Sequence, residues 1–300
     1  MMNISAETRK KYFYPLWNRF ASVFPVAATQ IKYRLVTGRK LNLKQPQTMN
    51  EKIQWLKLYR YRDNSLVKQC CDKYAVREYV TECGCSNILN DIYGTWEDPN
   101  QIDWDRLPDK FVLKCNHGSG QNIICEDKKK LDKTKAIQDL TEWLKEDYGK
   151  TNVELIYDGI PRCVVAEKFI ETADGLPPKD YKVFCSYGQP KLLFVASERS
   201  GDFARFDYYT PEWEWIPVKN NHPNAGKTGK PSFLADMLEY ANKLSKPFPI
   251  VRVDFYYESN RIIFGELTFL HFGGSAPFDP PSYDEEFGKL FDISSELEKG

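Results

Sequence analysis

The chain has 300 residues, of which 42% are hydrophobic and 28% are charged, and its formal net charge is zero. This length and composition are those of a globular protein with one large domain or two modest ones. No apolar run approaches the ~20 residues of a membrane span, and no signal-peptide pattern opens the sequence. Eight cysteines without a C-x-x-C spacing and only three histidines argue against a zinc site, so we expect free thiols in a reducing cytoplasm.

The first part of the chain is strongly basic. Residues 1–60 carry twelve Lys or Arg against two acids, a net charge of +10, and Lys11–Phe24 mixes these charges with aromatic residues. One interpretation is peripheral contact with an anionic membrane surface or an anionic polymer. The other is a helix that packs its aromatic side on the body and exposes its basic side to solvent. The balanced overall charge and the lack of RNA-binding motifs make nucleic acid a poor candidate partner.

Helices dominate the predictions for the first hundred residues. Residues 48–51 (TMNE) form a capping box, which predicts a helix start, and a second helix is predicted from about residue 64 to 80. The Pro- and Asp-rich segment 98–108 predicts a loop and a domain boundary. It contains Asp103-Trp104-Asp105, the only Asp-x-Asp of the chain.

Strand pairs with intervening helices follow, a pattern that predicts an α+β or mixed α/β fold. We expect strands at 111–115, 122–125 and 162–171, a hairpin over 180–198, and helices over 136–144 and from a Ser232 cap through Leu244. The acidic tail from about Asp284 is expected to be partly helical.

The segments RVDFYY (Arg252–Tyr257) and IIFGELTF (Ile262–Phe269) predict a β-hairpin. With a three-residue loop, Ser259–Arg261, Tyr256 lies opposite Phe264 and Asp254 lies opposite Glu266. Because side chains alternate, one face then collects Arg252, Asp254, Glu266 and Thr268. The core face collects Val253, Phe255, Ile263 and Leu267.

Two carboxylates opposite each other on a sheet repel unless a positive charge lies between them. A divalent cation with oxygen ligands is one candidate for that charge. The alternative is an exposed strand face on which one Arg is shared between the two acids.

Further candidate residues lie upstream of the hairpin. Lys114 ends a strand and leads into Asn116–Gly120 (NHGSG), whose glycines and N–H groups can approach phosphate oxygens, although the loop can also be a plain turn. Residues 167–170 (EKFI) close a strand whose edge can face a purine ring, and Asp180 can bind ribose hydroxyls. Lys182 and Arg199 can reach phosphate, or can form ordinary surface ion pairs.

Taken together and in order, these segments resemble the ATP-grasp superfamily, specifically its TupA-like branch, which is associated with bacterial polysaccharide and teichuronopeptide biosynthesis. The resemblance covers about residues 30–280 and is strongest in TMNEKIQWLK, DKYAVREYV, FVLKCNHGSG, DYKVF and RVDFYY…FGELTF. It implies an α+β, ATP-grasp fold in which two subdomains hold ATP between antiparallel sheets. The expected division is a mostly helical region over 1–107 and an ATP-grasp domain over 108–300, with a flap subdomain at about 108–165 and a metal and substrate subdomain at about 166–300.

The resemblance also implies roles for individual residues. The expected nucleotide contacts are Lys114, His117, Gly118, Ser119, Gly120, Glu167, Lys168, Phe169, Ile170 and Asp180. The expected catalytic residues are Arg252, Arg199 and Lys182. The expected Mg²⁺ ligands are Asp254, Glu266 and Thr268, although many ATP-grasp enzymes carry Asn at the position of Thr268. The candidate substrate residues are Lys73, His271, Gly273, Gly274 and Ser275.

The activity implied by the resemblance is an ATP-dependent carboxylate–amine ligase that works through an acylphosphate. Its expected substrates are a uronic acid of a glycan, or of a nucleotide- or lipid-linked sugar, and an amino acid or other amine. The expected location is the cytoplasm, either free in solution or in peripheral contact with the inner face of the membrane. Three alternatives stay open: a glycosyltransferase that uses Asp103-Trp104-Asp105, a sugar kinase with the same ATP site, and a glycan-binding module.

Overall fold

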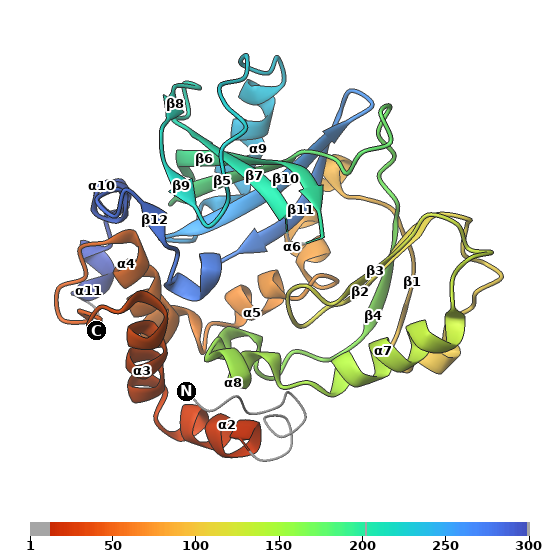
Figure 1. Ribbon diagram of the computed structural model, residues 1–300, viewed down its shortest axis with the longest axis horizontal. Helices are drawn as coiled ribbons and strands as arrows, with labels where there is room; N and C mark the ends of the chain where they lie inside the picture. Colours follow the sequence, from red (N-terminus) through yellow and green to blue (C-terminus); the bar gives the residue numbers. More distant parts are fainter. Residues whose placement is uncertain (1–12, 202, 299–300) are drawn as a thin grey trace.

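Two antiparallel sheets organise the protein in the computed structural model, which describes residues 13–201 and 203–298 (Figure 1). The smaller sheet has the strand order β1-β4-β2-β3, and every neighbouring pair is antiparallel. Its strands are β1 (Ile92–Trp96), β2 (Phe111–Cys115), β3 (Asn122–Cys125) and β4 (Val164–Lys168). The predicted bounds of β2 and β3 are confirmed. Strand β1 was not predicted, and it pairs with β4 although it precedes the proposed boundary at residue 107.

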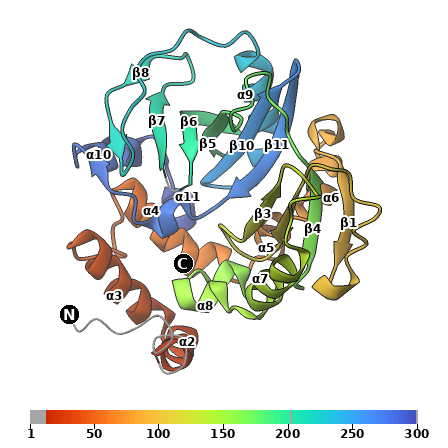
Figure 2. The ribbon, with the colours of Figure 1, turned by 45° about the vertical axis from the view of Figure 1, so that its right-hand side comes forward.

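The larger sheet has the strand order β11-β10-β5-β6-β7-β8. Its strands are β5 (Asp180–Ser186), β6 (Gln189–Ser200), β7 (Phe203–Tyr209), β8 (Trp215–Ile216), β10 (Val251–Glu258) and β11 (Arg261–Thr268). Strands β9 (Lys219–Asn220) and β12 (Phe278–Asp279) form a separate pair. Figure 2 shows the two main sheets as distinct units that lie side by side.

Helices surround both sheets. In chain order they are α2 (Tyr14–Val23), α3 (Pro25–Thr37), α4 (Met49–Leu56), η2 (Lys57–Tyr61), α5 (Ser65–Cys71), α6 (Val76–Glu82), η3 (Ser86–Ile88), η4 (Pro99–Gln101), α7 (Lys133–Lys145), α8 (Tyr148–Asn152), η5 (Leu155–Tyr157), α9 (Leu234–Ser245), η6 (His271–Gly274), α10 (Tyr283–Lys289) and α11 (Ser294–Leu297). No helix among the described residues is both long enough and apolar enough to span a bilayer.

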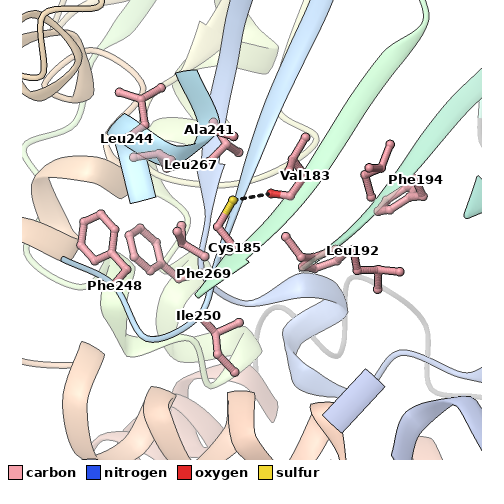
Figure 3. Packing of buried hydrophobic residues seen from close by; sticks show 14 of the residues in the cluster. Val183, Cys185, Leu192, Phe194, Ala241, Leu244, Phe248, Ile250, Leu267 and Phe269 are labelled. Carbon is pink, nitrogen blue, oxygen red and sulfur yellow. Dashed lines mark hydrogen bonds between the residues drawn. The ribbon is translucent and has the colours of Figure 1, made fainter. Parts of the chain in front are cut away.

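Each sheet buries one face in its own core. Helix α9 packs across β5, β6 and β10, and Figure 3 shows Ala241 and Leu244 of this helix against Val183, Cys185 and Leu267. The smaller sheet packs Phe111 and Leu113 with Leu140 of α7. Because strand side chains alternate, the opposite face of each sheet carries polar groups, and on the larger sheet these lie beside the buried rings of Phe184 and Phe194. All eight cysteines are free thiols, as expected.

The capping box at the start of α4 is confirmed. Glu51 N–H donates to Thr48 Oγ1 at 3.1 Å, and Thr48 N–H donates to Glu51 Oε2 at 3.2 Å. The single helix predicted over residues 64–80 is wrong, because the chain breaks into α5 and α6. At the break, the Asp72 carboxylate accepts the N–H groups of Tyr74 and Ala75 in the turn that leads into α6, which begins at Val76 without a side-chain cap. The predicted Ser232 cap is also wrong, since α9 begins after Phe233 without a side-chain cap.

Helices α2 and α3 project from the end of the molecule that lies away from the larger sheet (Figure 1). Trp17 anchors α2, and its indole N–H donates to the Thr151 carbonyl at 3.1 Å. The outer sides of these helices expose large apolar side chains: Leu16, Val23, Phe24, Ile31, Leu35 and Val36. Arg19 and Arg34 are exposed on the same two helices. Of the basic residues in the predicted membrane-binding segment, Arg9, Lys10 and Lys11 lie outside the described residues.

Candidate functional site

The hairpin of β10 and β11 places the four predicted polar residues together, as predicted from the pairing with a three-residue loop. Arg252 pairs with Thr268, and Asp254 pairs with Glu266. Closer to the turn the register differs, because Tyr256 lies opposite Ile263 and not Phe264. The loop has two residues, Ser259 and Asn260, with φ of 52° and 57°, and a bulge at Gly265 restores the predicted pairing beyond it.

The bulge also changes which apolar residues reach the core. Phe264 lies opposite Phe255, and both belong to the main core cluster together with Ile262. Ile263, which was predicted on the core face, lies opposite Tyr256 instead. That prediction is wrong because an extra residue in one strand inverts the alternation on the turn side of the bulge.

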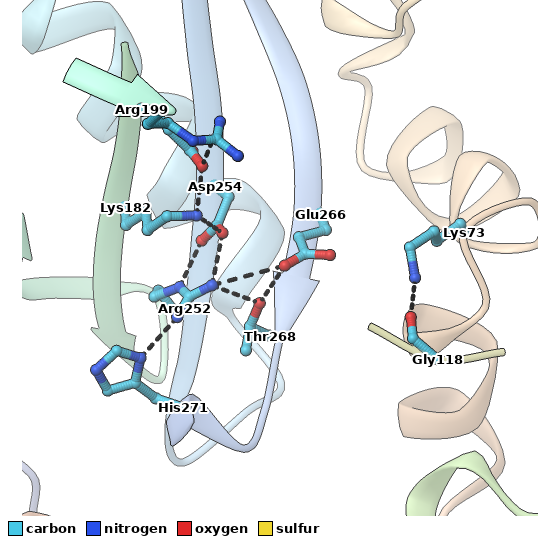
Figure 4. A network of polar contacts seen from close by, with 10 residues as sticks. Lys73, Gly118, Lys182, Arg199, Arg252, Asp254, Glu266, Thr268 and His271 are labelled. Carbon is cyan, nitrogen blue, oxygen red and sulfur yellow. Dashed lines mark hydrogen bonds and ion pairs between the residues drawn. The ribbon is translucent and has the colours of Figure 1, made fainter. Parts of the chain in front are cut away.

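Arg252 is the positive charge between the two carboxylates (Figure 4). Its Nε donates to Asp254 Oδ1 at 2.7 Å, and its Nη2 donates to Asp254 Oδ2 at 2.6 Å. The same Nη2 lies 3.6 Å from Glu266 Oε1 and donates to Thr268 Oγ1 at 3.0 Å. An Arg is thus shared between the acids, but the face is not exposed, because Asp254 is only 2% accessible.

Strand β5 adds a second cation and a third carboxylate to this face. Lys182 Nζ lies 2.5 Å from Asp254 Oδ2 and 2.6 Å from Asp180 Oδ2, and Arg199 Nη1 lies 3.7 Å from Asp180 Oδ2. Burial by itself would raise the pKa of Asp254, but Arg252 and Lys182 outweigh it and hold that pKa below the ordinary value. Burial does raise the pKa of Asp180, with Lys182 opposing the shift.

His271 closes the network on the side of the η6 loop. Its Nδ1 accepts from Arg252 Nη1 at 2.7 Å, and burial, with the charges of Arg252 and Lys182, lowers its pKa well below the ordinary range. A neutral His271 therefore orients the guanidinium without adding charge. Gly273 and Gly274, with φ of 60° and 70°, and Ser275 continue this loop.

Lys73 lies across from this network, as Figure 4 shows. The break between α5 and α6 directs its side chain to the NHGSG loop, where Nζ donates to the Gly118 carbonyl. Burial lowers the pKa of Lys73, and the charge of Glu266 opposes that shift. Glu266 and Lys73 therefore come from different parts of the chain and attract each other across the site. Ser119 and Gly120, in the same loop as Gly118, are exposed.

The two predicted lysines of the smaller sheet do not converge. Lys114 Nζ lies 2.7 Å from Glu167 Oε2, and both side chains are on the face that α7 does not cover. Lys168 falls on the other face by strand alternation, and its Nζ lies 3.2 Å from Asp91 Oδ2. A nucleotide contact by Lys168 stays a prediction, as do the backbone contacts of Phe169 and Ile170 in the segment that connects the two sheets.

His117 is buried against the end of α7 beside Arg162, and burial lowers its pKa. The Asp-x-Asp segment is far less organised than the hairpin. Asp103 is exposed, and its Oδ2 lies 3.2 Å from Arg106 Nε, an ion pair within one turn of chain. Trp104 packs against the core of the smaller sheet. Among the residues that the structure describes, no hydrogen bond or ion pair joins Asp103 to the buried charged network.

Magnesium suits the chemistry of the hairpin residues, which offer carboxylate and hydroxyl oxygens. The Glu266 side chain is 44% exposed, and its Oε2 accepts no hydrogen bond from any described residue. Both Asp254 oxygens already accept from Arg252 or Lys182, so this carboxylate would use its remaining lone pairs. Within the described ranges, no three His, Cys, Asp or Glu side chains cluster as a metal site.

The profile of one protein family, TupA-like ATPgrasp, matches residues 51–292. The chain belongs to the TupA-like ATP-grasp family. The predicted resemblance and the ATP-grasp fold are thereby confirmed, and membership places the protein among ATP-grasp enzymes. No match was found among curated proteins.

Solved structures give weaker likenesses, all with low identity. A D-alanine–D-alanine ligase from Bacillus anthracis complexed with ATP is 17% identical, with a TM-score of 0.43 over 68% of this chain and 57% of that one. The Helicobacter pylori D-alanine–D-alanine ligase is 16% identical, with a TM-score of 0.43 over 84% and 65%. An L-amino acid ligase from Bacillus licheniformis is 15% identical, with a TM-score of 0.42 over 72% and 43%. The chain thus spans less than two thirds of each of these proteins, and the family match carries the assignment.

Several residues of the polar site were not singled out from the sequence. Tyr256 lies on the face of Asp254, and its pKa is raised by the charge of Asp180 and by burial. Its place in RVDFYY, two residues after Asp254, was a usable signal. Lys57 and Glu154 are buried charged residues near the η6 loop. Lys57 ends the TMNEKIQWLK stretch, whereas no local pattern marks Glu154.

Proposed function

We propose that the protein is an ATP-dependent carboxylate–amine ligase that forms an amide through an acylphosphate. The observation that carries this proposal is the buried network of Arg252, Lys182, Asp254 and Glu266 on the hairpin face, with Lys73 and the NHGSG loop across from it. Such an arrangement supplies fixed positive charge and loop N–H groups where phosphate charge would develop. Asp180 is the candidate for the ribose and Lys114 for the phosphates.

In the proposed reaction, an oxygen of the substrate carboxylate attacks the γ-phosphorus of ATP, and ADP leaves. The neutral amine then attacks the acyl carbon, the C–O bond to phosphate breaks, and the proton that the nitrogen loses leaves with the released phosphate. Arg252, Lys182 and Arg199 would stabilise the negative charge on the transferred group. Asp254, Glu266 and Thr268 would hold Mg²⁺, which when bound neutralises phosphate charge. No protein nucleophile is required, because ATP provides the leaving group.

The proposed carboxylate is a uronic acid of a bacterial surface polysaccharide or of its nucleotide- or lipid-linked precursor, and the proposed amine is an amino acid or related amine. This choice follows the setting of the family and is an argument by analogy. We further propose that the enzyme works in the cytoplasm, at an anionic membrane surface. The exposed apolar residues and arginines of α2 and α3 support that contact.

Product analysis tests the reaction class. The protein would be incubated with Mg-ATP, glucuronate or galacturonate, and a panel of amines, and the products separated by mass spectrometry. A ligase yields ADP, free phosphate and an amide. ADP with a phosphorylated sugar would replace this proposal with a kinase. Turnover that survives unchanged in Glu266→Gln would show that the hairpin site is not responsible.

A further inference from the structure

His271 presents both of its ring nitrogens to hydrogen-bonding groups although it is buried. The residue is 2% accessible, and the ring centroids of Phe184 and Phe194 lie 5.0 and 5.6 Å from its own. Its Nδ1 lies 2.7 Å from Arg252 Nη1, and its Nε2 lies 3.3 Å from Asn220 Nδ2. The position of the ring proton is therefore determined by Arg252 and Asn220 and not by solvent.

The chemistry of these two neighbours decides which nitrogen of His271 carries the proton. A guanidinium has only N–H donors, so Nδ1 must accept from Arg252. An imidazole that accepts at Nδ1 carries its proton on Nε2, and this Nε2–H needs an acceptor. The Asn220 nitrogen is a donor, whereas the Asn220 oxygen is buried without a hydrogen-bond partner among the described residues. The amide therefore places a donor where the ring needs an acceptor, while its own acceptor is unused.

We propose that the Asn220 amide is turned by half a rotation about its Cβ–Cγ bond, so that its oxygen accepts the Nε2–H of His271 and fixes the tautomer that binds Arg252. The Tyr208 hydroxyl, 3.0 Å from the same amide atom, fits either orientation, because a hydroxyl both donates and accepts. The turn exchanges one unpartnered amide atom for the other, and it removes a buried contact between two donors. The arrangement with the oxygen toward His271 is therefore favoured.

The fold holds Asn220 in this place. Asn220 ends β9, pairs there with Phe278 of β12, and is 0% accessible. Tyr208 lies on β7, and its ring stacks on Phe194 with the centroids 4.9 Å apart. The two short strands β9 and β12 thus bring an amide from 51 residues upstream to His271.

The tautomer of His271 directs the guanidinium of Arg252 at the proposed phosphate site (Figure 4). Of the five guanidinium N–H groups, Nε donates to Asp254, Nη2 donates to Asp254 and Thr268, and Nη1 donates to His271. The second N–H of Nη1 has no hydrogen-bond partner among the described residues and can bind the transferred group. Asn220 is thus a positioning residue that acts on Arg252 through His271, and this role in turnover rests on the ligase function proposed above.

Nitrogen-15 NMR of the full chain with labelled histidine reads the tautomer directly. The chain has three histidines, so His271→Leu identifies the His271 signals, and His117 and His222 serve as internal references. We expect a neutral His271 ring with the proton on Nε2 and with Nδ1 as an acceptor. A proton on Nδ1 would overturn the proposal.

Two variants separate the oxygen of Asn220 from its nitrogen. Asn220→Asp keeps the shape and has only acceptors, so the Nε2–H signal of His271 should persist. In Asn220→Leu, the Nε2–H should exchange with water about tenfold faster or more, because its acceptor is gone. The matched control is Asn87→Leu, since exposed Asn87 also donates to a tyrosine hydroxyl, that of Tyr240, at 2.6 Å.

Loss of the Nε2–H signal in Asn220→Asp would overturn the proposal, as would an unchanged exchange rate in Asn220→Leu. If Asn220→Leu does not fold, the wild type and Asn220→Asp still decide, because an amide that donates from nitrogen to Nε2 cannot be replaced by a carboxylate without a change of tautomer.

Steady-state ADP release tests the effect on Arg252. Asn220→Leu should lower kcat by about tenfold and leave the KM for ATP nearly unchanged, because the orientation of the guanidinium matters most for the transferred group. Asn220→Leu combined with His271→Leu should be no slower than His271→Leu alone, since the amide acts through the ring. Losses that multiply would overturn the positioning role. Absence of ADP release in the wild type would count against the ligase function instead, because the tautomer is read separately.

Discussion

Arg252 and Asp254 form a buried ion pair, whereas Glu266 is half exposed. Neutralising Asp254 should therefore cost more stability than neutralising Glu266. Asp254→Asn would leave the guanidinium, which is 8% accessible, with a weakened partner. We expect a loss of about 3–5 kcal/mol in the free energy of unfolding, the usual cost of breaking a buried pair. Glu266→Gln should cost less than about 1 kcal/mol, because that side chain is half exposed. Urea unfolding measures both values, and equal losses would contradict the prediction.

This difference in stability makes Glu266→Gln the better variant for kinetic measurements. We expect Glu266→Gln to lower ATP turnover by about 10²-fold or more, the size of effect seen when one preorganised charge contact is removed. Asp254→Asn should also lose turnover, but its lower stability makes that loss harder to interpret. Steady-state ADP release at 25 °C is the measurement. Exposed Glu142→Gln is the control, and equal rates in Glu266→Gln and the control would exclude Glu266 from the reaction.

Lys57 gives the protein a defined dependence of stability on pH. Its folded-state pKa is lowered from 10.5 to about 7, chiefly by burial, with Glu154 opposing and Lys32 adding to the shift. Between these values the unfolded chain binds more protons at this position than the folded protein does. The contribution of Lys57 to stability is therefore present above pH 10.5 and is lost as the pH falls through 7.

Unfolding of the wild type and of Lys57→Met at several pH values checks this sign. The free energy of unfolding of the wild type minus that of the variant should increase from pH 7 to pH 10. Exposed Lys129→Met should show no such trend. A difference that stays flat, or that decreases with pH, would mean that Lys57 keeps its proton across this range.

At the scale of elements, the β10–β11 hairpin shows what a sequence pattern can and cannot determine. Composition and alternation correctly placed Asp254 opposite Glu266. The trial loop was one residue too long, and the bulge at Gly265 was not foreseen; these two errors cancel beyond Gly265. The register error is therefore confined to the residues between the bulge and the turn, such as Tyr256 and Ile263.

The break between α5 and α6 is a second case in which local pattern was insufficient. The apolar spacing of residues 64–80 is that of one continuous helix, and this spacing gives no sign that the helix ends at Asp72 and Lys73. The break is favoured by tertiary contacts, since the Lys73 N–H donates to the Asn116 carbonyl at 3.2 Å and its Nζ reaches Gly118. The Asp72 carboxylate then holds the turn before the second helix by accepting the N–H groups of Tyr74 and Ala75. The partner segment, forty residues away, could not be identified from helical periodicity.

Helices α2 and α3 are expected to bind anionic vesicles through their exposed side. Each Arg near a charged membrane contributes about 1 kcal/mol, so Arg19→Gln combined with Arg34→Gln should weaken partitioning by about 30-fold. Leu16→Ser with Leu35→Ser should weaken it further, because these side chains are 74% and 70% exposed. Sedimentation with phosphatidylserine and with phosphatidylcholine vesicles at low salt measures both effects.

The control for the vesicle experiment is Lys129→Gln with Lys130→Gln, which removes the same charge from another exposed segment. Neutralisation of Arg9, Lys10 and Lys11 in a separate variant tests the remaining basic residues of the segment. Equal binding to both lipids would exclude the electrostatic contribution. Binding that is lost equally in the control would mean that net charge, and not this surface, attracts the protein.

At the scale of the whole molecule, the site depends on contacts between distant parts of the chain. The hairpin motif and the NHGSG loop could be identified from the sequence because their residues are local. That Lys73 lies across from Glu266, or that the η2 turn of Lys57 packs against η5, depends on how distant segments pack, and no spacing encodes those contacts. The family resemblance placed TMNEKIQWLK among the strongest stretches without a role for it, and Gln54 of this stretch binds the carbonyls of Gly273 and Gly274 in the η6 loop.

The nucleotide that the whole protein recognises distinguishes a site at the hairpin from one at the Asp-x-Asp segment. A ligand at about 100 times its dissociation constant stabilises a protein by roughly 2.7 kcal/mol, which is readily visible as a rise in melting temperature. We expect this rise with Mg-ADP or a Mg-ATP analogue and not with Mn-UDP or Mn-UDP-sugars. It should be lost or much reduced in Glu266→Gln, because the nucleotide's phosphates and their cation would meet at that carboxylate. Asp103→Asn should leave it unchanged, because the described partner of the Asp103 carboxylate is nearby Arg106. If only the uridine ligands raise the melting temperature, and Asp103→Asn abolishes that rise, the nucleotide site lies at the Asp-x-Asp segment and not at the hairpin.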